Sequence, residues 1–583
     1  MNMRKTMTWT IAMVAAASMA LAGCGGNGAG DASASKSGYV QPADGVPSDY
    51  TGTLPAPDAS KAYNNPQERD NIQDGGTLTL ATTEIGPNWN ANSTDGNTLY
   101  MSEFWSFYQP HLWDYSFDGK ATPNPDFLSK VTLTSEDPMV VTYDINPDAK
   151  WNDGSEIDYT AFQSTWNALN GKDSAYNPPM TTGYDQIASV EKGESDKQVV
   201  VTFATPFYPY TGLFNLLVNP KAADADTFTQ GWTNDPHNEW AAGPFVVDSF
   251  DDSQVTFTPN PNWWGDKPKL DKVVFKQMES SAAINAFHNG EIDAVGASTA
   301  DNLKIVRSMD DVQIRIGYSK STDVLTYNGT ADALKDIAVR KAITQGFDQK
   351  TWSKIRYQGT DYDSPQPGSE CMLVFQDGYE NNLPKDSGYD VDAAKKTLED
   401  AGYTMGDAGY YQKDGKPVKI SYTYFGDDAT QTAMANAYQK MMKDIGVDCE
   451  IVNLDNSEFS KTLISKSFEV LAMGWSASDP YGYSTSGYQL YGSDSDSNYS
   501  FIGTPEIDAM LKKPSTMSDA TEAIAAFNEA EKAAFEQYGT IPTDVPPSYT
   551  AVKKGLANFG PSGFNNCNGG IWHTENIGWQ KEA

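Results

Sequence analysis

The chain is long, acidic and rich in aromatic residues. Its 583 residues exceed what a single hydrophobic core usually organises, so we expect two or three packing units. The 42 basic and 77 acidic residues give a formal net charge of −35. This charge argues against binding to nucleic acid or to anionic lipid headgroups. It is typical of a soluble exported protein, and it can also concentrate cationic ligands.

The N-terminus resembles a bacterial lipoprotein signal. A positively charged start is followed by an apolar run, WTIAMVAAASMALAG, which is as long as a signal-peptide core but short for a membrane span. The run ends directly before Cys24, so we expect residues 1–23 to be removed and Cys24 to be lipidated. Residues 24–69 are rich in Gly, Ser, Ala, Pro and Asp and are expected to form a flexible tether. No later segment is apolar enough to span a membrane, which predicts that the lipid is the only anchor.

Three further cysteines follow, Cys371, Cys449 and Cys567, and their spacing matches no metal-binding motif. An extracytoplasmic location permits one disulfide among them and leaves one thiol over. All three pairings are open at this stage.

The first half of the folded body is predicted to consist mainly of strands. Apolar and polar residues alternate in GGTLTLATTE (75–84) and SQVTFTP (253–259). β-branched residues are frequent in MVVTYDI (139–145) and QVVVTF (198–203). Turn signals such as Asn152-Asp153-Gly154 separate these runs.

The second half is predicted to alternate strands and helices. Apolar spacings of three and four indicate a helix at 339–347, and another is expected to begin after Asp390 and to end at Gly402. The elements that follow are a strand at 418–424, a helix at 430–445, a strand at 447–451, a short helix from 455 or 456, and a strand at 468–474. This β-α-β-α-β order predicts a parallel sheet with both faces covered. Ligands bind beyond the carboxyl ends of such strands, so we expect 475–483 in a ligand cleft.

Ser476 is the first candidate for chemistry in that segment. Gly474-Trp475-Ser476-Ala477-Ser478 nearly matches the G-x-S-x-G turn that presents a nucleophilic serine, but Ser478 replaces the last glycine. Asp479-Pro480 follows, and a proline disfavours helical geometry in the residue before it. None of the four histidines lies in a recognisable catalytic context. We therefore expect that Ser476 is not a nucleophile and that the protein is not an enzyme.

A metal site is not expected either. Asp494, Asp496 and Asn498 resemble the start of an EF-hand loop, but Tyr499 and Pro505 occupy the positions that require Gly and a bidentate Glu. We interpret this segment as a solvated loop. No other metal or nucleotide motif occurs, so we expect no cofactor. Among the 77 acidic residues, no spacing singles out a pair for glycoside hydrolysis.

An aromatic surface remains as the candidate binding feature. Trp475, Tyr481, Tyr483, Tyr488 and Tyr491 lie close together in the sequence after the last predicted strand. Such residues offer large contact areas and polar handles, which suit peptides as well as sugars. The competing interpretation is that several of them pack in the domain interior.

Several sequence blocks together resemble family 5 extracellular solute-binding proteins of ABC importers, the oligopeptide- and dipeptide-binding lipoproteins. The resemblance covers about 75 to 580. The matching blocks are Lys150-Trp151-Asn152-Asp153-Gly154 with Thr160-Ala161-Phe162, then Ala242-Gly243-Pro244-Phe245, Pro259-Asn260-Pro261-Asn262-Trp263-Trp264-Gly265, Phe287 with Gly290-Glu291-Ile292-Asp293, and Val339-Arg340-Lys341-Ala342-Ile343 with Asp348. Each block is weak alone, whereas their order and spacing are specific.

The resemblance implies an α/β fold of the type II periplasmic-binding-protein class, with two lobes that close on a cleft and an inserted extra domain. Domain I is expected to comprise 70–108, 229–325 and 546–583. Domain II is expected at 109–228 and domain III at 326–545. Domains I and III are expected to close over the ligand.

The resemblance also implies a ligand site. In peptide-binding members an Asp shortly after the Gly-Trp of the last domain III strand takes the amino terminus of the peptide; here Ser478 occupies that position and Asp479 follows. Glu84 resembles the pocket-facing acid of the family, with Trp89 nearby. The candidate ligand-binding residues are Glu84, Trp89, Tyr176, Asn328, Phe425, Trp475, Ser478, Asp479, Tyr481 and Tyr483.

The expected function is that of a monomeric lipoprotein on the outer face of the bacterial cytoplasmic membrane. It would capture oligopeptides and deliver them to the permease subunits of an ABC transporter. Two alternatives stay open: an oligosaccharide-binding protein of the same family, and a secreted hydrolase, for which no catalytic pair is found.

Overall fold

The computed structural model describes residues 64–581, apart from 118, 361, 427–428, 455–457, 478, 496 and 565–572. The chain divides into Met1–Ser37 and Gly38–Ala583, and every described residue belongs to the second unit. The predicted lipidation site Cys24, the candidate Ser478, and Cys567 lie outside the described residues. Within the described part, no helix combines the length and apolar character needed to cross a membrane.

The first sheet has four strands in the order β1-β10-β9-β8. Their bounds are β1 (Thr77–Thr82), β8 (Phe245–Phe250), β9 (Gln254–Pro259) and β10 (Lys272–Gln277). β1 is parallel to β10, and β9 is antiparallel to β10 and to β8. Leu78 and Leu80 of β1 are buried in a core with the aromatic residues of helix α1 (Leu99–Tyr108), in agreement with the alternation predicted for 75–84.

A smaller sheet, β11-β21-β12, joins distant parts of the chain. Its strands are β11 (Ala294–Gly296), β12 (Val312–Tyr318) and β21 (Pro547–Lys553), and β21 is antiparallel to both neighbours. Helices α3 (Ser280–His288) and α4 (Ala300–Val306) contribute apolar side chains to the core beside this sheet.

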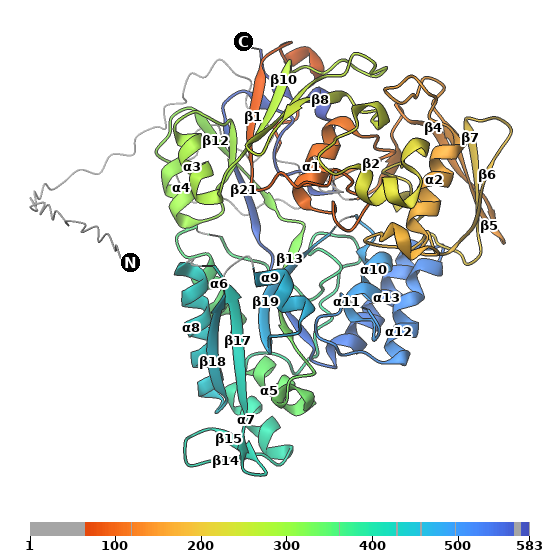
Figure 1. Cartoon of the computed structure of the whole chain (residues 1–583). Coiled ribbons are helices and arrows are strands. Elements are labelled where there is room, and N and C mark those ends of the chain that lie inside the picture. Colours follow the sequence, from red (N-terminus) through yellow and green to blue (C-terminus); the bar gives the residue numbers. More distant parts are fainter. Residues whose placement is uncertain are drawn as a thin grey trace, which may run out of the picture. The chain divides into compact units, whose positions relative to one another are not determined.

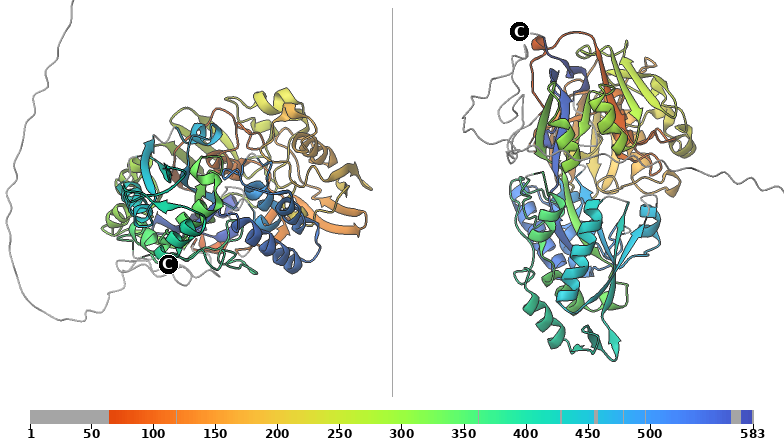
Figure 2. Two further views of the ribbon diagram at one scale, coloured as in Figure 1. Left: turned by 90° about the horizontal axis from the view of Figure 1, so that it is seen from below. Right: turned by 90° about the vertical axis from the view of Figure 1, so that its left-hand side faces the viewer.

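The start and the end of the described chain are paired. Ile72 forms an antiparallel bridge with Gln580, and β22 (Leu556–Ala557) pairs with β23 (Gly578–Trp579). The side chain of Asn65 donates to the carbonyl oxygen of Leu556 at 3.0 Å and to Oε1 of Gln580 at 3.1 Å. In the right-hand view of Figure 2 the red start of the described chain accordingly lies beside the C-terminal end.

A separate antiparallel sheet, β4-β5-β7-β6, lies at the right of Figure 1. Its strands are β4 (Leu128–Glu136), β5 (Met139–Ile145), β6 (Ile187–Lys192) and β7 (Gln198–Phe203), preceded by the pair β2 (Trp113–Tyr115) and β3 (Ala121–Pro123). β5 and β7 have the bounds predicted from the sequence. Helix α2 (Tyr159–Leu169), which Asp158 caps by accepting from the amide of Thr160 at 2.9 Å, packs against this sheet.

The largest sheet has five strands in the order β18-β17-β19-β13-β20. Their bounds are β13 (Ser321–Tyr327), β17 (Lys419–Phe425), β18 (Asp448–Leu454), β19 (Val470–Ser476) and β20 (Thr540–Asp544). β17 is parallel to β18 and β19, as predicted. β13 is antiparallel to β19 and to β20, so the sheet as a whole is mixed, and the parallel arrangement holds for the three strands of the predicted β-α-β units. The reason is that β13 and β20 are not part of the β-α-β units but connect this sheet with β12 and β21.

The helices around this sheet agree with the sequence pattern. They are α5 (Ile337–Gln345), α6 (Gln349–Arg356), α7 (Val391–Asp400), α8 (Ala429–Asp444) and α9 (Phe459–Ile464). Asp390 caps α7 by accepting from the amides of Asp392 and Ala393. Gly402 and Gly446 follow α7 and α8 with φ values of 86° and 78°, a left-handed conformation that favours glycine at helix ends.

A helical subdomain and several short elements complete the chain. The helices α10 (Gly482–Thr485), α11 (Gly487–Tyr491), α12 (Pro505–Lys512) and α13 (Ala520–Phe535) share one core. A small sheet contains β14 (Thr404–Met405), β15 (Tyr411–Lys413) and β16 (Lys416–Pro417). Short 3₁₀ turns lie at Arg69–Asn71, Ser174–Tyr176, Tyr210–Gly212, Pro220–Ala222, Asn238–Trp240, Ala333–Lys335, Pro514–Thr516 and Thr574–Asn576, and a π turn lies at Thr227–Gly231.

The chain passes between the β11-β21-β12 sheet and the five-stranded sheet at two adjacent crossings. One leads from β12 to β13 and the other from β20 to β21, and the amide of Ser319 in the first donates to the carbonyl of Pro546 in the second at 3.1 Å. Arg356 of α6 forms ion pairs with Asp323 of β13 and, at 3.1 Å, with Asp544 of β20. One arginine thus contacts both crossing strands, in addition to the backbone pairing between them.

Two of the three cysteines of the folded body, Cys371 and Cys449, lie within the described residues. Cys371 and Cys449 are buried free thiols, so these two do not form a disulfide with each other. Burial raises the pKa of both thiols, to about 12 in the case of Cys449.

Candidate functional site

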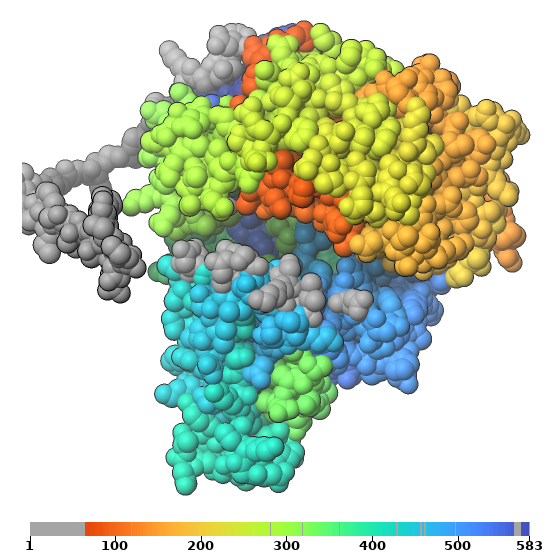
Figure 3. Space-filling view, in the orientation of Figure 1, coloured from red at the N-terminus to blue at the C-terminus, as the bar shows by residue number. Residues whose placement is uncertain are grey.

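A cavity of about 910 Å³ is lined by residues of β1, α1, β11 and β21 on one side and by the segment after β19 on the other. This volume is in the usual range for ligand sites. On the face drawn in Figure 3, the surface is hollowed where segments coloured red to light green meet those coloured cyan to blue.

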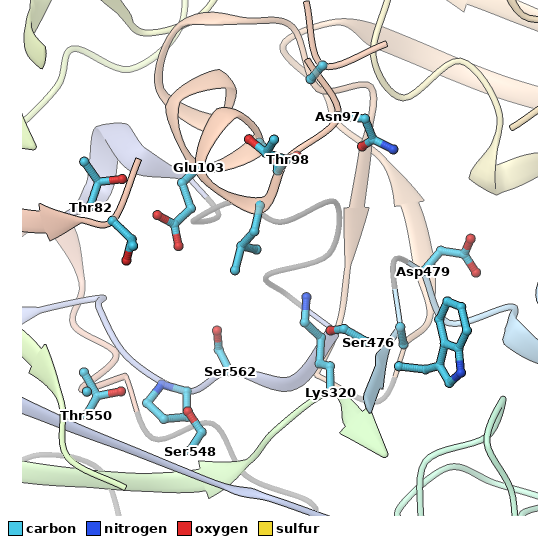
Figure 4. Close-up of a pocket in the computed structure, with 18 of the residues that line it drawn as sticks. Thr82, Asn97, Thr98, Glu103, Lys320, Ser476, Asp479, Ser548, Thr550 and Ser562 are labelled. Carbon is cyan, nitrogen blue, oxygen red and sulfur yellow. Dashed lines mark hydrogen bonds between the residues drawn. The ribbon is translucent and has the colours of Figure 1, made fainter. Parts of the chain in front are cut away.

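Hydroxyl and amide side chains make up most of the polar lining. They come from segments far apart in the sequence and comprise Thr82, Thr83, Asn92, Asn97, Thr98, Ser102, Asn302, Ser476, Ser486, Gln489, Ser548, Thr550, Asn558 and Ser562, among others. Figure 4 shows ten of the lining residues with labels. Such uncharged groups can donate to and accept from a ligand in a fixed geometry.

Helix α1 forms the most regular part of the wall. Its N-cap is Thr98, whose hydroxyl accepts from the amide of Met101 at 3.1 Å. Leu99, Ser102 and Glu103 are three and four positions apart, so they share one face of the helix, and all three line the cavity. The buried residues of the same helix are Met101, Phe104, Trp105, Ser106, Phe107 and Tyr108. The packed core therefore fixes the position of the face that lines the cavity.

Glu103 is the acidic residue of this wall. Figure 4 shows its carboxylate pointing from α1 into the cavity. Within the described part of the chain, no donor or cation contacts this carboxylate. Loss of hydration raises its pKa to about 7.

The end of β19 and the segment that follows it form the opposite wall. The ring of Trp475 stacks on Tyr499 with 5.9 Å between ring centroids and 9° between planes. Asp479 Oδ1 accepts from the amide of Tyr481 at 2.6 Å, which makes a local turn. Loss of hydration raises the pKa of Asp479 to about 6, and the bond from Tyr481 opposes this rise. Trp475, Ser476 and Asp479 all line the cavity.

Four charged residues are found among the described lining residues: Glu103, Glu370, Asp479 and Lys320. Glu370 is buried, and loss of hydration, aided by the charge of Glu531, raises its pKa to about 8 although a bond from Thr540 opposes the rise. Lys320 lies in the crossing from β12 to β13. In Figure 4 Glu103, Lys320 and Ser562 point toward the same space, whereas the carboxylate of Asp479 points away from it.

No histidine lines the described part of the cavity beside Ser476. The four histidines of the chain, His111, His237, His288 and His573, are absent from the described lining. The described residues contain no group of three or more His, Cys, Asp or Glu side chains that could hold a metal ion.

Seven residues predicted for the site lie outside the lining. Trp89 is fully buried and its ring packs against Phe104, Tyr108 and Phe250. Glu84 is exposed and lies just beyond Thr82 and Thr83, which do line the cavity.

The other five have structural partners. The hydroxyl of Tyr176 donates to the carbonyl of Ala223 at 2.7 Å. The amide of Asn328 donates to the carbonyls of Lys466 and Phe468 at 3.2 and 2.8 Å. Phe425 packs against Phe459 at 5.1 Å. Tyr481 bonds to Thr211 and contacts the core that contains Tyr115, and Tyr483 packs in the α10–α13 core. These seven are therefore left out of the site proposed below.

The α1 residues were missed by sequence reasoning. The segment LYMSEFWSFY has apolar residues on nearly every side, so it lacks the polar stripe by which an amphipathic helix is recognised. The available signal was Glu103 itself, because it is the only charged residue in this ten-residue helix. A lone acid in such surroundings is rare unless it has a partner or a function.

Comparison with known proteins agrees with the architecture. The model of the bacterial extracellular solute-binding proteins, family 5 (middle region), matches residues 122–498. The oligopeptide-binding protein OppA of Mycobacterium tuberculosis is 31% identical over 508 residues, which cover 86% of this chain and 85% of that protein. The periplasmic EDTA-binding protein EppA has a similar structure, with a TM-score of 0.80, 27% identity, and coverage of 88% of this chain and 97% of that one.

A second solved structure shows the same fold at lower identity. AppA from Bacillus subtilis, in complex with a nonapeptide, has a TM-score of 0.74 and 17% identity over 88% of this chain and all of that one. These likenesses confirm the type II periplasmic-binding-protein fold, with two lobes and an extra domain. The chain belongs to family 5 of the bacterial extracellular solute-binding proteins, the binding components of ABC importers.

Proposed function

We propose that this protein captures oligopeptides in the cavity and delivers them to the permease of an ABC transporter. Its lipid on Cys24 would hold it on the outer face of the cytoplasmic membrane, and domains I, II and III would have the limits expected from the sequence. Binding would close the two lobes by bending at the crossings whose strands Arg356 contacts.

The observation that carries the proposal is the composition of the lining. Uncharged hydroxyl and amide groups outnumber the four charged side chains, and they come from both walls. A peptide presents an N–H and a C=O at nearly every residue, so such a lining suits its backbone independently of its sequence. The 31% identity to an oligopeptide-binding protein over 86% of the chain supports the same ligand class.

Trp475 and Asp479 have the expected ligand roles in this proposal. The Trp475 ring would provide contact area from the domain III wall. Asp479 would meet the ammonium group of the peptide if the turn that it now forms with Tyr481 opens or rotates on binding. No step of this mechanism breaks a covalent bond of the ligand.

The test is to identify the ligand that accompanies the protein. The full chain is purified under mild conditions, and the released solute is analysed by mass spectrometry. We expect peptides of several sequences, recovered unchanged after prolonged incubation with the protein. A sugar or a metal chelate as the sole bound solute would contradict the peptide assignment, and shortened peptides would contradict a purely binding role. Ser476→Ala serves as the control for hydrolysis, since the peptides recovered with it should be as long as those recovered with the parent.

A further inference from the structure

We propose that Glu103 binds a positively charged group of the ligand, so that the cavity selects peptides with a lysine or arginine side chain. This inference rests on the peptide-binding function proposed above and adds the class of peptide. It concerns the wall formed by α1, which is distinct from the segment after β19.

Packing of the aromatic residues of α1 fixes the position of the helix that carries Glu103. The neighbours of Glu103 in the helix are locked by aromatic contacts, such as those between Phe104 and Phe275 at 5.1 Å and between Phe107 and Phe257 at 5.5 Å. Trp105 adds a hydrogen bond from its indole nitrogen to the carbonyl of Trp89 at 2.7 Å. The backbone that carries Glu103 therefore has a defined position before any ligand arrives, which lowers the entropic cost of binding.

The carboxylate of Glu103 also lacks compensation within the described part of the chain. No described side chain donates to it, and burial in the cavity wall deprives it of part of its hydration, which raises its pKa to about 7. A buried carboxylate without a partner is costly, so it is usually paired or functional. A ligand ammonium or guanidinium would supply the missing partner and restore the ionised form.

The other acidic groups of the cavity are less suited to this role. Asp479 already accepts from the amide of Tyr481, and Glu370 is only 7% exposed, whereas Glu103 is half-buried and points into the cavity. Lys320 is the single basic residue in the described lining and would meet a negatively charged or carbonyl group of the ligand. Glu103 is thus the acceptor that remains for a cation.

The surroundings suit the apolar stem of a basic side chain. Leu99 and Met180 line the cavity, and their exposed fractions are 60% and 44%. Few other large apolar residues of the described chain are exposed to this extent. Lysine and arginine side chains carry apolar stems that pack on such residues while the charged end reaches a polar partner. The net charge of −35 would attract cationic ligands to the protein as well.

The experiment compares two matched peptide pools. Each contains pentapeptides of alanine, leucine and serine; in one pool a single lysine stands at any position, and in the other norleucine replaces that lysine. The ligand-free full chain is equilibrated with an equal mixture of both pools in dialysis, and the retained peptides are quantified by mass spectrometry. We expect lysine peptides to be enriched about 10- to 100-fold at pH 8.0, as a hydrogen bond to a charged group predicts.

Two controls separate Glu103 from the rest of the protein. Glu103→Gln should retain norleucine peptides as the parent does but lose the lysine preference. Glu136→Gln removes the same charge from an exposed site at the end of β4, away from the cavity, and should keep the preference. Enrichment in the parent should fall nearly to parity between pH 8.0 and 5.5, because a carboxyl with a pKa of about 7 is then about 3% ionised.

The outcomes distinguish this inference from the proposed function. Equal retention of both pools by the parent, or a lysine preference that survives in Glu103→Gln, would overturn the role of Glu103 while peptide binding stands. Retention of neither pool would overturn the peptide function. In that case the role of Glu103 is tested by comparing how hexylammonium and 1-hexanol shift the melting temperature of the protein. Stabilisation of the parent by hexylammonium alone, lost in Glu103→Gln, supports the site. Equal shifts with both compounds overturn it.

Discussion

Replacing Arg356 by methionine should destabilise the protein in a pH-dependent way. The substitution leaves two carboxylates, Asp323 and the fully buried Asp544, facing one another without their cation. Removing one partner of a buried ion pair costs about 3–5 kcal/mol. Because 25% of the Arg356 side chain is exposed, we expect the lower end of that range, about 3 kcal/mol at pH 7.5.

The pH dependence follows from the proton that the variant must bind. Loss of hydration already raises the pKa of Asp323 to about 6 in the presence of Arg356, and without the arginine the pKa rises further. A carboxyl whose pKa is higher in the folded than in the unfolded state stabilises the fold as the pH falls, by up to about 1.4 kcal/mol per pH unit. The parent gains little above pH 6, so the deficit of Arg356→Met should shrink between pH 7.5 and 6.0.

Urea unfolding followed by tryptophan fluorescence measures both effects. Because m exceeds the small-protein range of about 1–3 kcal/mol/M in a chain of this length, the midpoint of Arg356→Met should lie below that of the parent by somewhat less than about 1 M at pH 7.5. Arg340→Met is the matched control, because Arg340 is also buried but donates to the backbone carbonyls of Leu334, Lys335 and Gln537, which do not titrate. An unchanged midpoint, or a deficit that is equal at both pH values, would refute the reasoning.

Three further predictions concern the ligand site, the motion and the anchor. Asp479→Asn keeps the acceptor for the Tyr481 amide and removes only the charge. If Asp479 meets the ammonium group of the peptide, calorimetric titration should show about 10- to 150-fold weaker binding of the peptide. Equal affinity of the variant and the parent excludes that role. Trp475→Ala should weaken binding as well, whereas Ser476→Ala should not. Small-angle scattering should show a smaller radius of gyration with ligand, and no change would argue against closure. Cys24→Ala should appear in the soluble fraction, and persistence at the membrane after a salt wash contradicts the lipid anchor.

Local signals predicted much of the fold because each acts over a few residues. The alternation in β5 and β7, the cap at Asp390 and the glycines after α7 and α8 are all decided by neighbouring side chains. The direction of β13 was not predicted, because it depends on where β12 and β21 lie rather than on the sequence of β13.

The residues that line the cavity were harder to predict, because residue type alone does not determine whether a side chain is buried or faces the cavity. Trp89 and Trp475 are both large aromatic residues near strand ends, yet Trp89 is buried in a core and Trp475 lines the cavity. Composition cannot separate these two cases, since burying an aromatic ring and presenting it to a ligand favour the same residue types. Glu103, by contrast, could have been identified as the lone charge of its helix.

The pairing between distant segments determines when the cavity can form during synthesis. β4, β5, β6 and β7 lie within one continuous stretch, so their sheet can assemble while the rest of the chain is still being made. The sheet β11-β21-β12 lacks its central strand until residue 553 has left the ribosome. The bridge between Ile72 and Gln580 can form only after Gln580 has been synthesised. Because Ser548 and Thr550 of β21 line the cavity, the cavity is among the last parts of the protein to be completed. A nascent chain that stops before β21 would contain a finished β4–β7 sheet but no complete ligand cavity.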